Sequence, residues 1–174
     1  MTACGLAWAG SPRAGSRDDE SVEYQVKLAF IYNLTKFIEW PSSAYPSPNA
    51  PLLIGIAGND PFSPHLEAEL RTHLAGSHPI EIRNLRRGDP VRACHVVFIP
   101  ESPGDEAAGI VEGLKGSSTL TVGESEGFAA RGGIINFVVE EHRLRVEVNP
   151  LAAKRAGLKI SSRLLSIATI VTDR

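Results

Sequence analysis

Two short segments of this 174-residue chain are almost entirely apolar: residues 52–57 (LLIGIA) and residues 95–100 (HVVFIP). A strand with one solvated face alternates apolar and polar residues, whereas a continuous apolar run is typical of a strand buried on both faces. Such strands occur mainly in parallel sheets that helices cover on both sides. We therefore expect an α/β fold built around a mainly parallel sheet.

The remaining segments extend this pattern. Further strands are expected at residues 80–85, 119–122, 134–139 and 144–148, and helices at residues 21–40, 64–75, 105–115, 150–156 and from residue 162 onward. The last two strands flank a short turn and predict an antiparallel hairpin at one edge. Together these elements predict one three-layer, Rossmann-like domain over residues 21–174, with parallel strands in the order 2-1-3-4-5.

The helix expected at residues 21–40 is apolar on more than one side. Ser21 is expected to cap it, and Pro41 to end it. One stripe at spacings of three and four predicts the inward side: Val22, Val26, Phe30, Leu34 and Phe37. A second apolar side either lies deep in the fold or forms a subunit interface, and we predict that it is a homodimer face: Leu28, Ile31, Tyr32 and Ile38.

Residues 1–20 show neither helical nor strand periodicity. The triplet Ala7-Trp8-Ala9 has the small-x-small form of a signal peptidase site, but the basic and apolar regions before it are missing. We interpret the segment as the remnant of an export signal truncated at Met1. A lipoprotein site at Cys4 and a tail without function remain alternatives. No run of about 18 apolar residues is present, so a membrane-spanning helix is not expected.

Composition argues against several classes of site. If cleavage follows Ala9, Cys94 is the one cysteine left, and its position before an apolar strand predicts an inert buried thiol. No cysteine and histidine spacing is typical of zinc, so we predict no metal and no cofactor. A formal net charge of -2 gives no long-range attraction to nucleic acid.

One enzyme motif is present at residues 123–127 (GESEG), which has the G-x-S-x-G form of a hydrolase nucleophile elbow. A triad with Ser125 would need an acid and a histidine. The nearby candidates, Glu140, Glu141 and His142, are adjacent in sequence, so their side chains would point in different directions. We therefore expect Ser125 to cap a short helix within residues 123–131, and we expect no enzyme activity.

The loop at residues 57–62 follows the first strand at the edge where open α/β sheets bind ligands. It lacks the spaced glycines of a dinucleotide fingerprint. We expect Asp60 to cap the next helix or to form an Asx turn, with a ligand role as the alternative. Near the C-terminus, an apolar tail at residues 164–171 follows a polar cluster. The predicted partner or ligand-binding residues are Asn149, Ser161, Ser162, Arg163 and Leu164. For Ser161 or Ser162 we favour capping of the following helix over a binding role.

Three segments together resemble the YfiR family, which is similar to the HmsC repressors. They are residues 26–41 (VKLAFIYNLTKFIEWP), residues 56–62 (IAGNDPF), and residues 127–137 (GFAARGGIINF) with 148–165 (VNPLAAKRAGLKISSRLL). The matches run in order over most of residues 22–171. Family members carry a similar acidic turn before the Gly-Phe pair without hydrolase activity.

The resemblance implies a periplasmic repressor that docks on the periplasmic domain of an inner-membrane diguanylate cyclase and lowers cyclic di-GMP and biofilm formation. It also implies a homodimer, and it leaves an outer-membrane lipoprotein open as a further partner. Better-known relatives contain disulfides, whereas this domain has Cys94 alone. The alternatives are a periplasmic small-ligand sensor and, distantly, a small serine hydrolase. A sensor should retain a polar pocket, and a regulator should expose an apolar patch.

Overall fold

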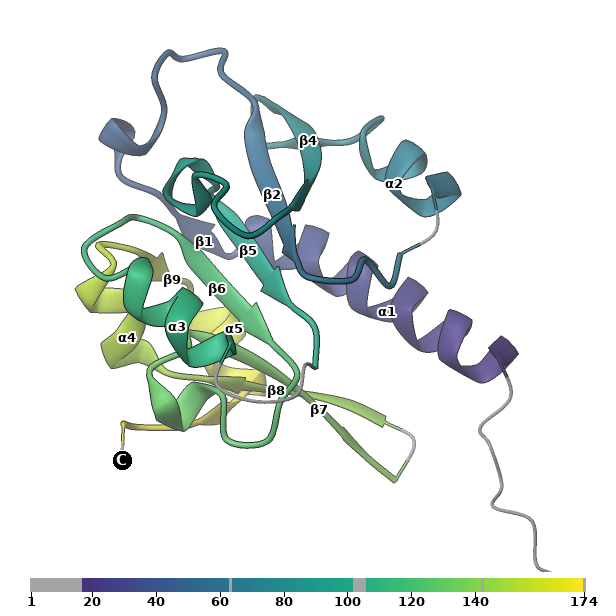
Figure 1. Ribbon diagram of the computed structural model, residues 1–174. Coiled ribbons are helices and arrows are strands. Elements are labelled where there is room, and N and C mark those ends of the chain that lie inside the picture. The colour runs from purple at the N-terminus through teal and green to yellow at the C-terminus, as the bar shows by residue number, and fades with distance from the viewer. Residues whose placement is uncertain (1–16, 63, 102–105, 142, 174) are drawn as a thin grey trace, which may run out of the picture.

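The computed structural model describes residues 17–62, 64–101, 106–141 and 143–173. An eight-stranded, mainly parallel sheet lies at its centre, with the strand order β10-β8-β7-β6-β5-β2-β4-β3 (Figure 1). Its strands are β2 (Leu52–Ala57), β3 (Leu74–Ala75), β4 (His78–Leu85), β5 (Val96–Ile99), β6 (Leu120–Gly123), β7 (Ile135–Glu140), β8 (Arg143–Val148) and β10 (Thr169–Ile170). The α-helices are α1 (Arg17–Thr35), α2 (Pro64–Leu70), α3 (Glu106–Gly113), α4 (Pro150–Arg155) and α5 (Ser162–Ile167). The 3₁₀ turns are η1 (Ser42–Ala44), η2 (Val91–Ala93) and η3 (Ala129–Arg131). This arrangement confirms the expected α/β class.

The predicted strand order is confirmed. The five strands β4-β2-β5-β6-β7 are parallel neighbours, which in chain order is 2-1-3-4-5, and β8 pairs antiparallel with β7 as the expected hairpin. Two edge strands were not predicted: β10 runs parallel to β8, and β3 runs antiparallel to β4. A separate small sheet joins β1 (Ile38–Glu39) to β9 (Lys159–Ile160).

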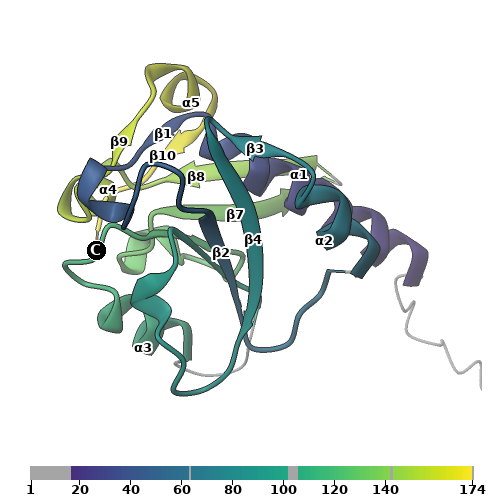
Figure 2. The ribbon, with the colours of Figure 1, turned by 90° about the horizontal axis from the view of Figure 1, so that it is seen from above.

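Helices cover both faces of the large sheet, with α1 on one side and α3 on the other (Figure 2). The central strand β5 shows why both layers are needed. Its residues Val96 and Phe98 pack in the cluster that contains Leu28 of α1, whereas Val97 and Ile99 pack with Ala107 of α3. All four β5 side chains are at most 2% exposed, so the continuous apolar run indeed marks a strand buried on both faces.

The predicted inward stripe of α1 is only partly correct. Leu34 is buried in the core and Phe37 packs against it, whereas the first three positions are exposed. Val22, Val26 and Phe30 are 57%, 41% and 36% exposed. The side chains that enter the core are Leu28, Ile31, Leu34 and, beyond the helix, Ile38. Figure 1 shows that the N-terminal half of α1 projects past the sheet, so its apolar residues there have no strand to cover.

The predicted dimer face is corrected by the same result. Leu28, Ile31 and Ile38 are 4%, 0% and 5% exposed within one chain, so they cannot contact a second chain, and Tyr32 is half-buried. The helix bounds also differ from expectation. Because α1 begins at Arg17, Ser21 lies inside the helix and does not cap it. The helix ends before Pro41, because residues 38–39 pair with β9.

Truncation of a core residue should separate the two sides of α1. Ile31→Ala should lower the free energy of unfolding by about 2–5 kcal/mol, since it leaves a cavity under the sheet. Val22→Ala, on the exposed side, should change it by about 0.5 kcal/mol or less. Urea denaturation of both variants measures the difference, and equal losses would contradict this orientation of the helix.

The imidazole of His95 holds the connector that follows α1. Its ring is 4% exposed; Nδ1 accepts a hydrogen bond from the Leu53 N–H (3.0 Å), and Nε2 lies 3.1 Å from the Ala44 carbonyl oxygen. The Tyr45 ring stacks on it at 4.4 Å. These contacts require a neutral ring that donates from Nε2 and accepts at Nδ1. Burial lowers the pKa of His95 below its usual value, although the Ala44 hydrogen bond opposes this.

Acidification should therefore destabilise the fold. In the unfolded chain His95 takes up a proton near pH 6.5, whereas the folded chain resists protonation to a lower pH. The stabilisation that neutral His95 contributes is fully present above pH 6.5. It is lost as the pH falls from 6.5 toward the lowered pKa of His95 in the folded chain. In urea denaturation at pH 7.5 and 5.0, His95→Gln should be the less stable protein at pH 7.5 but lose less stability on acidification than the parent chain. An equal loss in both would rule out His95 as the source.

Candidate functional site

The predicted binding residues near the C-terminus lie on α4, α5 and the segments beside them. Asn149 is fully buried and caps α4. Its Oδ1 accepts from the Ala152 N–H (3.0 Å), while Nδ2 donates to the Ala129 carbonyl (2.8 Å) and to Asp173 Oδ1 (2.6 Å). Both ends of the amide are thus occupied within the chain, so Asn149 has a structural role and does not belong to an open binding site.

The other four predicted residues divide between surface and core. Ser161 caps α5 by accepting a hydrogen bond from the Arg163 N–H at 3.3 Å, as the capping interpretation requires. Ser162 and Arg163 are exposed, whereas Leu164 is 3% exposed and packs in the main core. Of the five, only Ser162 and Arg163 present their side chains fully to solvent.

The apolar tail is covered only in part. Ile167 at the end of α5 is 77% exposed, and Ile170 in β10 is 50% exposed. Strand β10 pairs with β8 through Thr169 opposite Glu147 and Ile170 opposite Val148, and it is the outermost strand on that side of the sheet. We call residues 162–170 the C-terminal edge. It combines an outer strand with large exposed apolar side chains, the features that favour pairing with another chain.

An ion pair holds the end of the chain beside this edge. Arg155 Nη1 lies 2.6 Å from Asp173 Oδ2, and the other oxygen of that carboxylate accepts from Asn149. Hydrogen bonds from Arg155 and Asn149 lower the pKa of Asp173. No local sequence pattern signals a pair that is 18 residues apart, so the sequence alone does not predict it.

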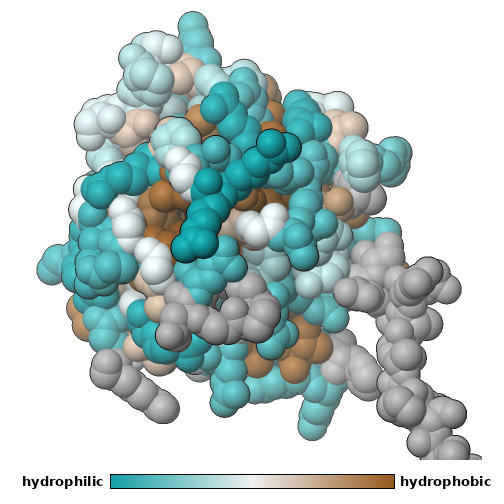
Figure 3. Space-filling view, in the orientation of Figure 1, coloured by the Kyte–Doolittle hydropathy of each residue, from teal (hydrophilic) through white to brown (hydrophobic). Residues whose placement is uncertain are grey.

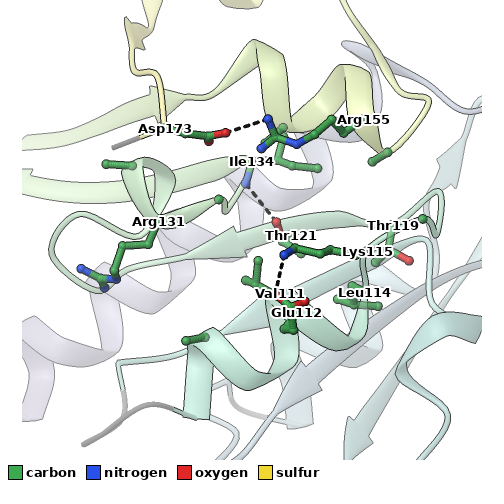
Figure 4. A pocket seen from close by; sticks show the side chains of 16 residues that line it. Val111, Glu112, Leu114, Lys115, Thr119, Thr121, Arg131, Ile134, Arg155 and Asp173 are labelled. Atoms are coloured by element: carbon green, nitrogen blue, oxygen red, sulfur yellow. Dashed lines mark hydrogen bonds and ion pairs between the residues drawn. The ribbon is translucent and has the colours of Figure 1, made fainter.

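A cavity of about 700 Å³ lies between α3, η3 and α4, with Asp173 among its lining residues (Figure 4). The polar groups labelled there bond to other parts of the protein. Thr121 Oγ1 accepts from the Ile134 N–H (2.9 Å), and Lys115 pairs with Glu112. On the same side of the molecule, Figure 3 shows a largely hydrophilic surface with apolar atoms at the base of a hollow. The cavity thus offers space but no converging set of reactive groups.

The G-x-S-x-G motif has a structural explanation. A Cβ atom at Gly123 would lie 2.5 Å from the Phe128 ring, and Gly127 has φ 67°, so both positions favour glycine. Ser125 does not cap a helix as predicted, because η3 begins at Ala129 after Phe128. Glu140 is 2.7 Å from Arg145 Nε, and His142 lies outside the described residues.

Asp60 and Cys94 have the structural roles expected from the sequence. Asp60 forms the Asx turn, accepting from the Phe62 N–H at 2.8 Å, and Cys94 is buried. Cys4 and the Ala7-Trp8-Ala9 triplet lie outside the described residues. Within the described part of the chain, no helix has the length and apolar character needed to cross a bilayer, and no three acidic, cysteine or histidine side chains gather as metal ligands.

Comparisons with known proteins agree with this fold. The profile of a family described as YfiR/HmsC-like (DUF4154), known for periplasmic regulators, matches residues 24–169. A crystal structure of a conserved domain protein from Vibrio cholerae O1 biovar El Tor is similar with a TM-score of 0.51 and 13% sequence identity, over 84% of this chain. The present chain spans 59% of the length of that protein. No curated protein sequence matches significantly.

The structural role of Asn149 can be tested against a ligand role. Asn149→Ala should lower the free energy of unfolding by roughly 2 kcal/mol, because the variant loses a helix cap and buried hydrogen bonds. Ser162→Ala, at an exposed neighbouring position, should change it by about 0.5 kcal/mol or less. Urea denaturation supplies both values. An Asn149→Ala protein as stable as its parent would show that the observed contacts contribute little.

Proposed function

We propose that this chain, which belongs to the YfiR/HmsC-like family, represses an inner-membrane diguanylate cyclase by docking on its periplasmic domain. The family is regulatory and periplasmic, and its match covers nearly all of the folded domain. Repression of this kind requires only that the docked protein binds the inactive cyclase more tightly than the active one. No catalytic group is needed for that mechanism.

The C-terminal edge is the observation that carries this proposal. An exposed outer strand offers backbone groups to a partner strand, and Ile167 and Ile170 offer apolar contacts. Arg163, exposed on the same segment, adds a charge that would select partners by complementarity. Leu164 in the core and the Asp173 ion pair beyond the strand anchor the segment, so a partner would meet a surface that is already formed.

Two further properties belong to the same proposal. The chain acts in the periplasm, where the regulators of this family are found. The protein also forms a homodimer, for which the exposed stripe of Val22, Val26 and Phe30 on α1 replaces the buried face first considered. These three side chains recur every four residues on one side of the helix, the spacing that helix-to-helix packing uses.

The opposite edge of the sheet supplies a matched control for the docking test. Strand β3 is also two residues long and outermost, and its Leu74 is 55% exposed, close to the value for Ile170. Ile170→Glu and Leu74→Glu therefore introduce the same charge at equally exposed edge positions. Both variants should have the melting temperature of the parent chain. With equal melting temperatures, any difference in repression between the two variants arises from binding.

We expect deletion of the gene to raise cellular cyclic di-GMP, and deletion of the cyclase as well to restore the low level. Ile170→Glu and Arg163→Glu should behave like the deletion, whereas Leu74→Glu should still repress. Full repression by Ile170→Glu would place the docking surface elsewhere. Unchanged cyclic di-GMP after gene deletion, with a neighbouring cyclase expressed, would refute the repressor function itself.

A further inference from the structure

A second cavity, about 410 Å³, lies at the carboxyl ends of the parallel strands. Strand β6 pairs with β7 only as far as Gly123 and Asn136, whereas β7 continues to Glu140, so the cavity opens beyond the end of β6. Figure 1 shows the arrowheads of β5 and β6 directed to the side from which α1 and the β7–β8 hairpin project. Open α/β sheets commonly bind ligands at this end.

The lining of this cavity is strongly acidic. It contains five glutamates and one lysine, which gives a formal charge of -4 at neutral pH: Glu23, Glu101, Glu124, Glu126, Glu147 and Lys27. The lysine and two of the glutamates already form ion pairs with one another. Lys27 Nζ lies 2.5 Å from Glu124 Oε2 and also contacts Glu23, and the side chains of Lys27 and Glu124 are each 5% exposed. Glu124 accepts further hydrogen bonds from Tyr24 Oη and from the Glu101 N–H.

The charge state of this pair is fixed. Burial by itself would lower the pKa of Lys27, but its hydrogen bonds to Glu124 and Glu23 and their charges outweigh burial and raise the pKa. Lys27 therefore remains an ammonium group and offsets only part of the negative charge. The excess negative charge attracts a cation and repels an anion.

Asn136 provides an independent sign of a missing partner. The residue is fully buried and lines the cavity, and its Oδ1 is the one buried side-chain polar atom in the described part of the chain without a hydrogen-bond partner. Its Nδ2 donates to Glu147 Oε2 at 2.9 Å, and because a carboxylate only accepts, the amide cannot be flipped. The open position on Asn136 is therefore an acceptor, which only a donor can satisfy.

We propose that this pocket binds a small organic cation that carries a primary ammonium group. The ammonium would donate to Asn136 Oδ1 and to the Glu147 carboxylate beside it, while Val139, which is 47% exposed, borders the pocket with apolar surface for the carbon skeleton. The described residues contain no cluster of metal ligands, so the geometry favours an amine over a bare divalent ion. The pocket adjoins the C-terminal edge, because Glu147 lies opposite Thr169 of β10, but the proposed amine binding does not depend on the proposed function.

Titration calorimetry of the full chain with putrescine and with glucosamine tests the proposal, and the two amines distinguish a polyamine from an amino sugar. 1,4-Butanediol and glucose are the matched ligands without nitrogen. We expect one amine to bind one-to-one, to shift the Asn136 side-chain amide signals in NMR, and to bind much more tightly than its nitrogen-free match.

Two variants with the same charge change locate the site. Glu147→Gln removes the carboxylate in the pocket. Glu140→Gln removes a carboxylate on the β7–β8 hairpin; this carboxylate pairs with Arg145 and does not line the pocket. Glu147→Gln should weaken amine binding about tenfold or more, the loss expected for a charge-assisted hydrogen bond. Glu140→Gln should bind like the parent chain.

Several outcomes would overturn the proposal. Equal weakening in both variants would indicate non-specific attraction by surface charge. Binding of Mg²⁺ or Ca²⁺ that displaces the amine at lower concentration would indicate a metal site. If neither amine binds and the Asn136 amide shows only contact with a long-lived water in NMR, the open acceptor serves a buried water. Thermal melting confirms beforehand that each variant is folded.

Discussion

The apolar character of the central strands on both faces is the constraint from which the rest of this structure follows. Because Val96 and Phe98 face one layer and Val97 and Ile99 the other, the sheet needs a helical cover on each side. Helix α1 supplies one cover and α3 the other. With both faces occupied, the ends and the outer strands of the sheet remain for contacts with other molecules, together with the outer side of α1. The two candidate sites lie in those places.

The outer strands differ in what lies beside them. On one side β3 follows α2 and pairs with the long strand β4. The Leu74 carbonyl oxygen of β3 accepts a hydrogen bond from the Tyr32 hydroxyl. On the other side β10 extends the sheet beyond the hairpin, with Ile167 and Ile170 exposed next to it. Globular proteins usually shield such edges by charge, shortness or cover. Here shortness applies to both strands, but the apolar surplus is concentrated at the C-terminal edge.

Much of the fold could be predicted because the decisive patterns are local. Continuous apolar strands, the hairpin turn and the cap at Ser161 are each encoded within a few residues. The orientation of α1 could not, since the helix is apolar nearly all round and periodicity offered two stripes; the choice between them depends on where the sheet ends. The cap at Asn149 has a sequence signal, an asparagine before a proline, although we predicted a binding role for that residue.

Contacts between residues that are far apart in the sequence could not be predicted, because no local pattern encodes them. Lys27 and Glu124 are separated by 97 positions, and the motif around Glu124 suggested a serine nucleophile instead. The acidic pocket forms only in the folded chain, where Glu23 and Lys27 of α1 lie beside the ends of β5 and β6. Its unmet acceptor on Asn136 depends on the orientation of one amide, which no sequence rule specifies.

The ion pair between Arg155 and Asp173 has a practical consequence for experiments with fusion proteins. Asp173 lies three residues beyond Ile170, so a fluorescent protein or affinity tag joined after it would start beside the C-terminal edge. Such a tag would compete with any partner for space there, and a charged linker would compete with Asp173 for the guanidinium. A loss of regulation in a strain tagged at that position would then report on the label, not on the protein. Reporters for this chain are better inserted at a site remote from that end, such as the β3–β4 turn at Gly76 on the opposite edge of the sheet.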